Sequence, residues 1–102
     1  MTAANPPLAQ VKIWVDDDRQ PSHGWAWAKT SLEAIQMLQT HDPGVVGELS
    51  LDYSLGGGDN GGLVLQWLHN NPTRWPATVD VHTSSVSARA LLFQMISDWK
   101  PQ

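Results

Sequence analysis

Short runs of β-branched and aliphatic residues alternate along this 102-residue chain with segments of helical periodicity. Such alternation is typical of α/β proteins, in which helices connect the parallel strands of a sheet. The expected strands are residues 11–15, 25–29, 46–52 and 78–82, and the expected helices occupy about 31–41, 63–70 and 86–99. A chain of this length supports one domain with one modest core. We therefore expect the element order β-β-α-β-α-β-α in a single domain at 11–100, after a flexible N-terminal arm at 1–10.

Local signals define the ends of the expected helices. Thr30 and Glu33 have the spacing of a capping box, and Pro43-Gly44 and Pro72 break the helices that precede them. Each helix then has a predicted apolar stripe that faces the core. The stripe residues are Leu32, Ile35 and Leu38, then Leu63, Val64, Trp67 and Leu68, and finally Ala88, Leu91, Leu92, Met95, Ile96 and Trp99.

The expected strands alternate apolar and polar residues. Ile13 and Leu51 would face one side of the sheet, whereas Lys12, Trp14 and Ser50 would face the other. A parallel sheet covered on both faces has nearly continuous apolar strands instead. We therefore expect a four-stranded, mainly parallel sheet with three helices mostly on one face. The second face would be covered thinly, by the loop at 16–24, the N-terminal arm or a partner such as a second copy of the chain.

Charge and composition exclude several classes of function. The chain carries 6 Lys and Arg against 10 Asp and Glu, a net charge of −4, so a broad basic surface for long nucleic acids is not expected. The absence of cysteine excludes disulfides, thiolate nucleophiles and cysteine-ligated zinc. No segment approaches the ~20 apolar residues of a membrane span, and the first residues do not resemble a secretory signal. We expect a soluble, cytoplasmic protein without membrane contact.

Polar residues follow three of the four expected strands. The first strand ends in Asp16 and Asp17, the third in Asp52 and the fourth in His82. Ligands of parallel α/β sheets bind outside the carboxyl ends of the strands. Carboxylates that converge there repel one another unless a cation lies between them, and Mg²⁺ or another divalent ion prefers such oxygen ligands. The alternative is that these acidic residues only cap and solubilise the strand ends.

Other residues near these strand ends have two interpretations each. His82 suits a general acid or base because its usual pKa lies near neutrality, or its ring closes the top of the sheet through a hydrogen bond. Thr83 and Ser84 would bind phosphate oxygens or cap the last helix. Arg19 would bind a phosphate with its planar guanidinium or pair with Asp16 or Asp18. The glycine-rich stretch 56–62 predicts a loop, which we expect to form a flexible lid over the acidic edge rather than a dinucleotide site.

Three motifs resemble a known family. The order of strand-Asp-Asp, strand-Asp and strand-hydroxyl is similar to the receiver domain of response regulators, in which an acidic pair and a phosphoacceptor Asp hold Mg²⁺. More closely, residues 13–21, 50–56 and 81–84 resemble the cyclic-phosphate processing receiver domain, whose pattern is D-D-x-R-x-P, S-L-D-H-D-L-G and H-S-x-N. The resemblance covers about residues 11–98. It implies a reduced receiver fold, which is flavodoxin-like.

The resemblance also implies roles for individual residues. Asp16, Asp17 and Asp52 would form the acidic metal pocket, Arg19 would support a phosphate or an ion pair, and His82 with Thr83 would match the family's H-S pair. The chain departs from the pattern at Tyr53, Ser54 and Ser85, where the family has His, Asp and Asn.

These expectations lead to one main functional hypothesis and two alternatives. The main one is a metal-assisted domain that binds or hydrolyses a cyclic phosphate of a nucleotide or RNA end. Asp52, His82 and Thr83 would be catalytic in it, while Arg19 and Ser84 would bind the phosphate. The first alternative is a binding or dimerisation module that has kept the fold without activity. The second is a signalling domain that accepts a phosphoryl group on Asp52.

Overall fold

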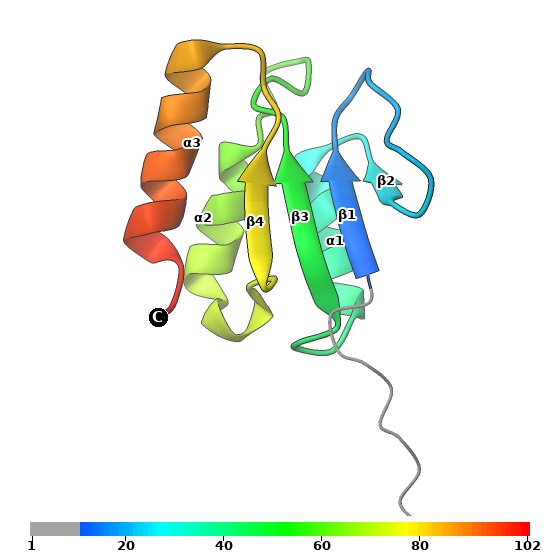
Figure 1. Cartoon of the computed structure of the whole chain (residues 1–102), viewed down its shortest axis with the longest axis vertical. Coiled ribbons are helices and arrows are strands. Elements are labelled where there is room, and N and C mark those ends of the chain that lie inside the picture. The colour runs from blue at the N-terminus through cyan, green and yellow to red at the C-terminus, as the bar shows by residue number, and fades with distance from the viewer. Residues whose placement is uncertain (1–10) are drawn as a thin grey trace, which may run out of the picture.

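The structure, a computed structural model, describes residues 11–102 and has the expected order of elements (Figure 1). The expected N-terminal arm lies outside the described residues. The strands are β1 (Val11–Val15), β2 (Ala26–Ala28), β3 (Val46–Leu51) and β4 (Thr78–Val81). The helices are α1 (Ser31–Thr40), α2 (Gly62–Asn70) and α3 (Val86–Trp99), with one short 3₁₀ turn at Pro72–Arg74.

The four strands form one sheet in the order β2-β1-β3-β4, and every neighbouring pair is parallel. This is the strand order with which flavodoxin-like sheets begin. The loop at 16–25 joins β1 to β2 without a helix, so these two strands pair in parallel through a connection of irregular backbone. The expected fold class, a reduced flavodoxin-like sheet with three helices, is confirmed.

The helices leave one face of the sheet open. Figure 1 shows α1 and α2 behind the sheet and α3 beside β4, with no helix in front. Toward the helices, Ile13, Leu49 and Leu51 are fully buried. On the open face the strand register aligns Trp14 with Ser50 across β1 and β3. The alternation of apolar and polar residues therefore predicted the two faces correctly, because only one of them meets helices.

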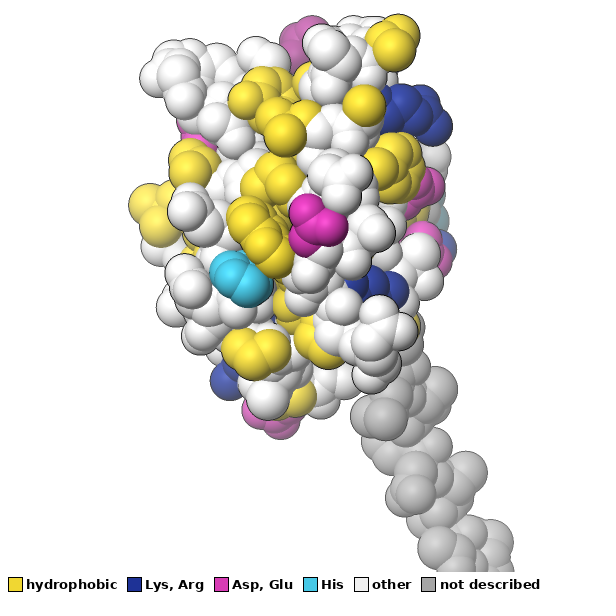
Figure 2. Space-filling model, turned by 90° about the vertical axis from the view of Figure 1, so that its left-hand side faces the viewer, with side chains coloured by type: hydrophobic (Ala, Val, Ile, Leu, Met, Phe, Trp, Pro, Cys, Tyr) yellow, Lys and Arg dark blue, Asp and Glu magenta, His cyan; other side chains and the backbone are white. Residues whose placement is uncertain are grey.

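The predicted helix stripes need three corrections, since Leu32, Leu63 and Leu91 are 62%, 42% and 47% exposed. In α1 the buried positions are Ser31, Ala34 and Leu38, a spacing of three and four residues that rotates Leu32 toward solvent. Figure 2, which faces the side of the molecule that carries α3, shows apolar side chains among the polar ones there.

No helix within residues 11–102 is long and apolar enough to cross a membrane.

Side-chain caps hold the helix starts in place. The hydroxyl of Thr30 accepts the backbone N–H of Glu33 at 3.0 Å, as the predicted capping box requires. The carboxylate of Glu33 accepts the N–H of Lys29 at 2.9 Å rather than that of Thr30. At α3 the cap is Ser85, whose hydroxyl accepts the N–H of Ala88 at 3.2 Å. Of these caps, Ser85 lies in the loop that also carries His82, whereas α2 begins at Gly61 without a side-chain cap.

Candidate functional site

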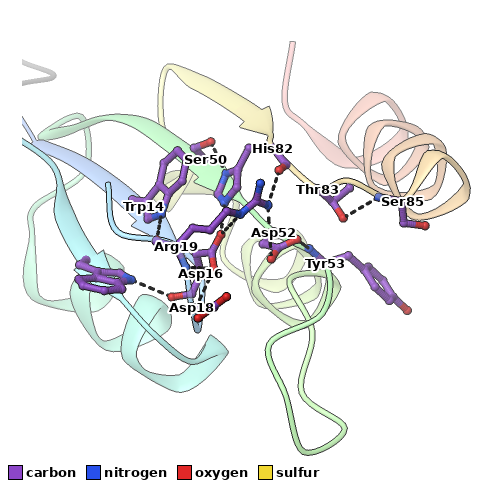
Figure 3. Close-up of polar contacts among 11 residues, drawn as sticks. Trp14, Asp16, Asp18, Arg19, Ser50, Asp52, Tyr53, His82, Thr83 and Ser85 are labelled. Carbon is purple, nitrogen blue, oxygen red and sulfur yellow. Dashed lines mark hydrogen bonds and ion pairs between the residues drawn. The ribbon is translucent and has the colours of Figure 1, made fainter. Parts of the chain in front are cut away.

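Three polar side chains that each follow a different strand meet at the carboxyl edge of the sheet (Figure 3). Asp16, Asp52 and His82 come directly after β1, β3 and β4, and one potential ligand atom of each lies within 4.8 Å of the others. The sheet hydrogen bonds extend to these residues, because the N–H groups of Asp52 and His82 bind the carbonyls of Val15 and Leu51 at 2.9 Å. The sheet therefore fixes the backbone of the group.

Asp16 is the buried centre of this group, with a side chain only 1% exposed. Its Oδ1 accepts the backbone N–H groups of Asp18 and Arg19 at 2.9 and 2.8 Å. Its Oδ2 lies 3.3 Å from Arg19 Nε and 3.0 Å from His82 Nε2. Burial acts to raise the pKa of Asp16, but the backbone hydrogen bonds and His82 outweigh it, so the pKa lies below its usual value. Asp16 is therefore held as a carboxylate.

Arg19 bridges the two carboxylates. Besides its contact with Asp16, its Nη2 donates to the carbonyl of His82 at 2.9 Å and lies 3.9 Å from Asp52 Oδ2. The Arg19 side chain is 52% exposed, and within residues 11–102 its Nη1 has no hydrogen-bond partner. The interpretation of Arg19 as a partner of Asp16 is thus confirmed, and its free edge remains available to an anion.

His82 is held on both ring nitrogens. Because the carboxylate of Asp16 only accepts, Nε2 carries a proton, and Nδ1 of the neutral ring accepts the hydroxyl of Ser50 at 2.7 Å. The ring also stacks on Trp14, with 3.6 Å between centroids and 5° between planes. Burial lowers the pKa of His82, and the opposing effect of Asp16 is smaller. The neutral ring is therefore the favoured state.

Asp52 connects this group to an adjacent pocket. Its Oδ1 accepts the N–H of Tyr53 at 2.8 Å, and its side chain also lines a pocket of about 510 Å³. The pocket lies between the loops that follow β3 and β4 and the first turns of α3. Its lining residues are Asp52, Tyr53, Ser54, Thr83, Ser84, Ser85, Ser87, Ala88 and Leu91.

A close backbone contact sets the position of Asp52. A Cβ atom on Gly61 would lie 2.2 Å from the Asp52 carbonyl oxygen, so only glycine fits there. The N–H of Gly61 donates to the carbonyl of Tyr53 at 2.8 Å. The start of α2 thus lies directly against the end of β3. One glycine of the predicted loop is explained by this packing rather than by flexibility.

The rest of the glycine-rich loop is a turn held by hydrogen bonds, which differs from the flexible lid that the sequence predicted. Ser54 and Asn60 form an isolated antiparallel bridge that closes it. The carboxylate of Asp59 accepts both the N–H and the hydroxyl of Ser31 at the start of α1, at 2.8 and 2.6 Å. These bonds attach the loop to α1, and an acidic side chain near the N-terminal N–H groups of a helix is favourable.

The structure places the predicted site residues in two neighbouring groups. Asp16, Arg19 and His82 lie together with Asp52, while Thr83 and Ser84 line the pocket on the other side of Asp52. Asp17 belongs to neither group. Asp17 is exposed and lies beside Gly56, where an added Cβ atom would be 3.2 Å from its Oδ2.

Several residues of the site were given no role in it from the sequence. Ser50 and Trp14 hold His82 from the open sheet face, and Tyr53, Ser54, Ser85 and Ser87 complete the pocket. Two signals were available for Ser50: its polar side chain in a strand whose apolar neighbours are buried, and its place at the start of the S-L-D motif. Tyr53, Ser54 and Ser85 also stood at motif positions, where they differ from the family pattern.

The donor set fits a divalent cation. Two carboxylates and an imidazole are common ligands of such ions, so Asp16, Asp52 and His82 could hold one once Nε2 of the ring has given up its proton. In the structure, however, Arg19 contacts the same two carboxylates and supplies their positive charge. Arg19 and any cation held by this group would therefore share the same carboxylates.

The parallel sheet, the carboxylates at its carboxyl edge and the hydroxyl residue after β4 define a receiver-like α/β domain. Residues 11–98 match the family described as the cyclic-phosphate processing receiver domain. The chain belongs to this family, as the three motifs predicted. No curated protein and no solved structure shows significant similarity to the chain.

Proposed function

We propose that the pocket beside Asp52 binds the cyclic phosphate of a nucleotide or RNA end. The observation that carries this proposal is the lining of the pocket. Six of its residues bear hydroxyl groups, and they surround the start of α3. The first N–H groups of a helix lack partners within the helix and attract anions. Hydroxyls and helix N–H groups together suit the oxygens of a phosphate.

The charge of the pocket favours a cyclic phosphate over an open one. Neither Lys nor Arg lines it, and its one charged residue is Asp52. A cyclic phosphodiester carries one negative charge, whereas an open phosphate monoester carries almost two at neutral pH. Neutral donors balance a single charge more easily than two when a carboxylate is nearby. Arg19 does not line the pocket, but its Nη2 lies 3.9 Å from Asp52 Oδ2 and places a positive charge beside this carboxylate.

The size and the apolar wall of the pocket suit a mononucleotide. Its volume of about 510 Å³ lies within the range of small-molecule sites, ~300–1,000 Å³. Ala88 and Leu91 form apolar surface beside the hydroxyls, and Tyr53 offers an aromatic ring on which a base can stack. A ribose with its cyclic phosphate would contact the hydroxyls while the base contacts this wall.

Hydrolysis of the ring would require Asp52 and its neighbours to act on the bound phosphate. Asp16, Asp52 and His82 would hold a divalent cation, with Mg²⁺ proposed first because carboxylate oxygens dominate the group. When bound, such an ion would neutralise charge on the phosphoryl group. Thr83 accepts the N–H of Ser85 at 3.4 Å, so its own O–H is available to donate to a phosphate oxygen. Ser84 is exposed at the pocket and would do the same.

The test is calorimetric titration with adenosine 2′,3′-cyclic phosphate and with the corresponding 3′-monophosphate. We expect tighter binding of the cyclic compound, and Thr83→Val should weaken it at least about tenfold, since a hydrogen bond to a charged group is lost. Ser97→Ala, on an exposed hydroxyl near the end of α3, is the matched control and should not change binding.

Chromatography of the same mixtures with Mg²⁺ distinguishes binding from turnover. Appearance of a monophosphate would assign hydrolysis, and binding without product would assign a binding module. Tighter binding of the open monophosphate, or no effect of Thr83→Val, would contradict the proposed pocket.

A further inference from the structure

Arg19 and the candidate metal position share the same ligands. Its Nε lies 3.3 Å from Asp16 Oδ2 and its Nη2 lies 3.9 Å from Asp52 Oδ2. These carboxylates, with His82, form the group of possible metal ligands whose atoms lie within 4.8 Å of one another. We propose that Arg19 and a divalent cation exclude each other here, so that Arg19 is a built-in competitor that lowers the metal affinity of the site.

Distance and charge make simultaneous occupancy unfavourable. A small divalent ion binds carboxylate oxygens at ~2.0–2.2 Å and would lie between Asp16 and Asp52. The guanidinium already contacts both carboxylates from the same space, so the two cations would be only a few ångströms apart. Like charges at such separations repel strongly in a partly buried site. One of the two must therefore be absent.

The hydrogen bonds of Asp16 allow the exchange without unfolding the loop. Its Oδ1 is occupied by two backbone N–H groups, which keep the loop after β1 in its turn. Its Oδ2 instead contacts only side-chain atoms, Nε of the half-exposed Arg19 and Nε2 of His82. A metal ion would thus replace side-chain contacts at Oδ2 while the backbone contacts at Oδ1 stay unchanged.

Hydrogen bonds hold the backbone of Arg19, so only its side chain would need to move when a metal binds. Its N–H donates to Asp16, and its carbonyl accepts the indole N–H of Trp14 at 2.8 Å. The side chain is half exposed and is fastened at its end by the carbonyl of His82. The guanidinium can therefore swing into solvent from a fixed backbone. Without metal it returns and neutralises the carboxylates.

The test measures Mn²⁺ binding alone, by the electron paramagnetic resonance signal of the free ion, without any nucleotide. This inference rests on the metal site of the proposed function but not on phosphate binding, so the two can fail separately. We expect Arg19→Gln to bind Mn²⁺ at least tenfold more tightly than the wild type, and Arg19→Lys to lie between them. Arg89→Gln removes an equal charge from α3, where Arg89 lies 5.6 Å from the Phe93 ring, and should change little.

Two further measurements locate the effect. Adding Asp52→Asn to Arg19→Gln should abolish the gain, and circular dichroism should show that each variant is folded. In the wild type, saturation with Mg²⁺ should shift the ¹⁵N resonance of Arg19 Nε as its contact with Asp16 is lost. Equal or weaker Mn²⁺ binding by Arg19→Gln would overturn the inference, and so would an unchanged Nε signal at saturation. Absence of Mn²⁺ binding in every variant would overturn it together with the metal site.

Discussion

His82 shows how a single residue can be fixed in the site by contacts that come from distant parts of the chain. Ser50 and Asp16 bind its two nitrogens, and Trp14 covers one face of its ring. If Nδ1 took up a proton, the Ser50 hydroxyl could no longer donate to it. This hydroxyl would have to accept a hydrogen bond instead, in a partly buried site. His82 thus acts first as a structural link between β1, β3 and β4, and the expected general acid would need this link to open.

The lowered pKa of His82 makes stability depend on pH. Burial disfavours the charged ring in the folded state, so the unfolded chain binds the proton more readily. The neutral His82 ring therefore contributes to the free energy of unfolding. This contribution is fully present above the pKa of His82 in the unfolded chain, about 6.5, and is lost as the pH falls from there toward the lower pKa of His82 in the folded state. Urea unfolding measured from about pH 7.5 down to about pH 5 should therefore show that the free energy of unfolding decreases as the pH is lowered.

Matched variants isolate His82 within that pH profile. His82→Gln should reduce the fall, because the titrating group is gone. His23→Gln, on an exposed residue of the loop after β1, should keep the wild-type profile. Identical profiles for both variants would show that the network around His82 does not control its protonation.

At the scale of elements, the packing of α2 against β3 positions Asp52. The Asp52 carbonyl occupies the space of a Cβ on Gly61, at 2.2 Å. Gly61→Ala should therefore lower the free energy of unfolding by about 1–3 kcal/mol, as overpacking of a tight contact does. Gly24→Ala is the comparison, because its position has a φ of 96° but nothing within 4 Å. Chemical denaturation of both variants measures the difference, and an equal or smaller cost at Gly61 would contradict the close contact.

The elements themselves could be predicted because their signals are local. The alternation in β1 and β3, the cap at Thr30 and the stop at Pro72 all act within a few residues. The site was less predictable, because its contacts join residues far apart in the sequence. Ser50 is 32 residues from His82, and Arg19 is 63 residues from it. The strand ends predicted that Asp16, Asp52 and His82 meet, but they also predicted Asp17, which does not join the group. The pairing of Arg19 with Asp16 was one of its two interpretations, whereas its approach to Asp52 was not predicted.

At the scale of the whole molecule, the proposed metal site would couple ion binding to stability. Asp16, Asp52 and His82 follow three different strands, so an ion bound to all three would connect β1, β3 and β4 in the folded state only. A ligand at ten times its dissociation constant stabilises the native state by about 1.4 kcal/mol. In a domain of this size 1 kcal/mol corresponds to about 4–8 °C, so the melting temperature should rise by about 6–11 °C. We expect a rise of this size in saturating Mg²⁺, followed by the fluorescence of the tryptophans.

Asp52→Asn should remove the rise, because the neutral amide is a poorer ligand and one carboxylate of the group is lost. Asp98→Asn is the matched control. Its exposed carboxylate on α3 accepts a hydrogen bond from Gln94 and lies outside the site, so the rise should remain. Because Arg19 must leave before the ion enters, Arg19→Gln should melt lower than the wild type without metal and gain more from Mg²⁺. A rise that persists in Asp52→Asn would place the bound ion elsewhere on this acidic chain, and the side chains at the three strand ends would then be linked by Arg19 and by the hydrogen bond between His82 and Asp16 rather than by a metal.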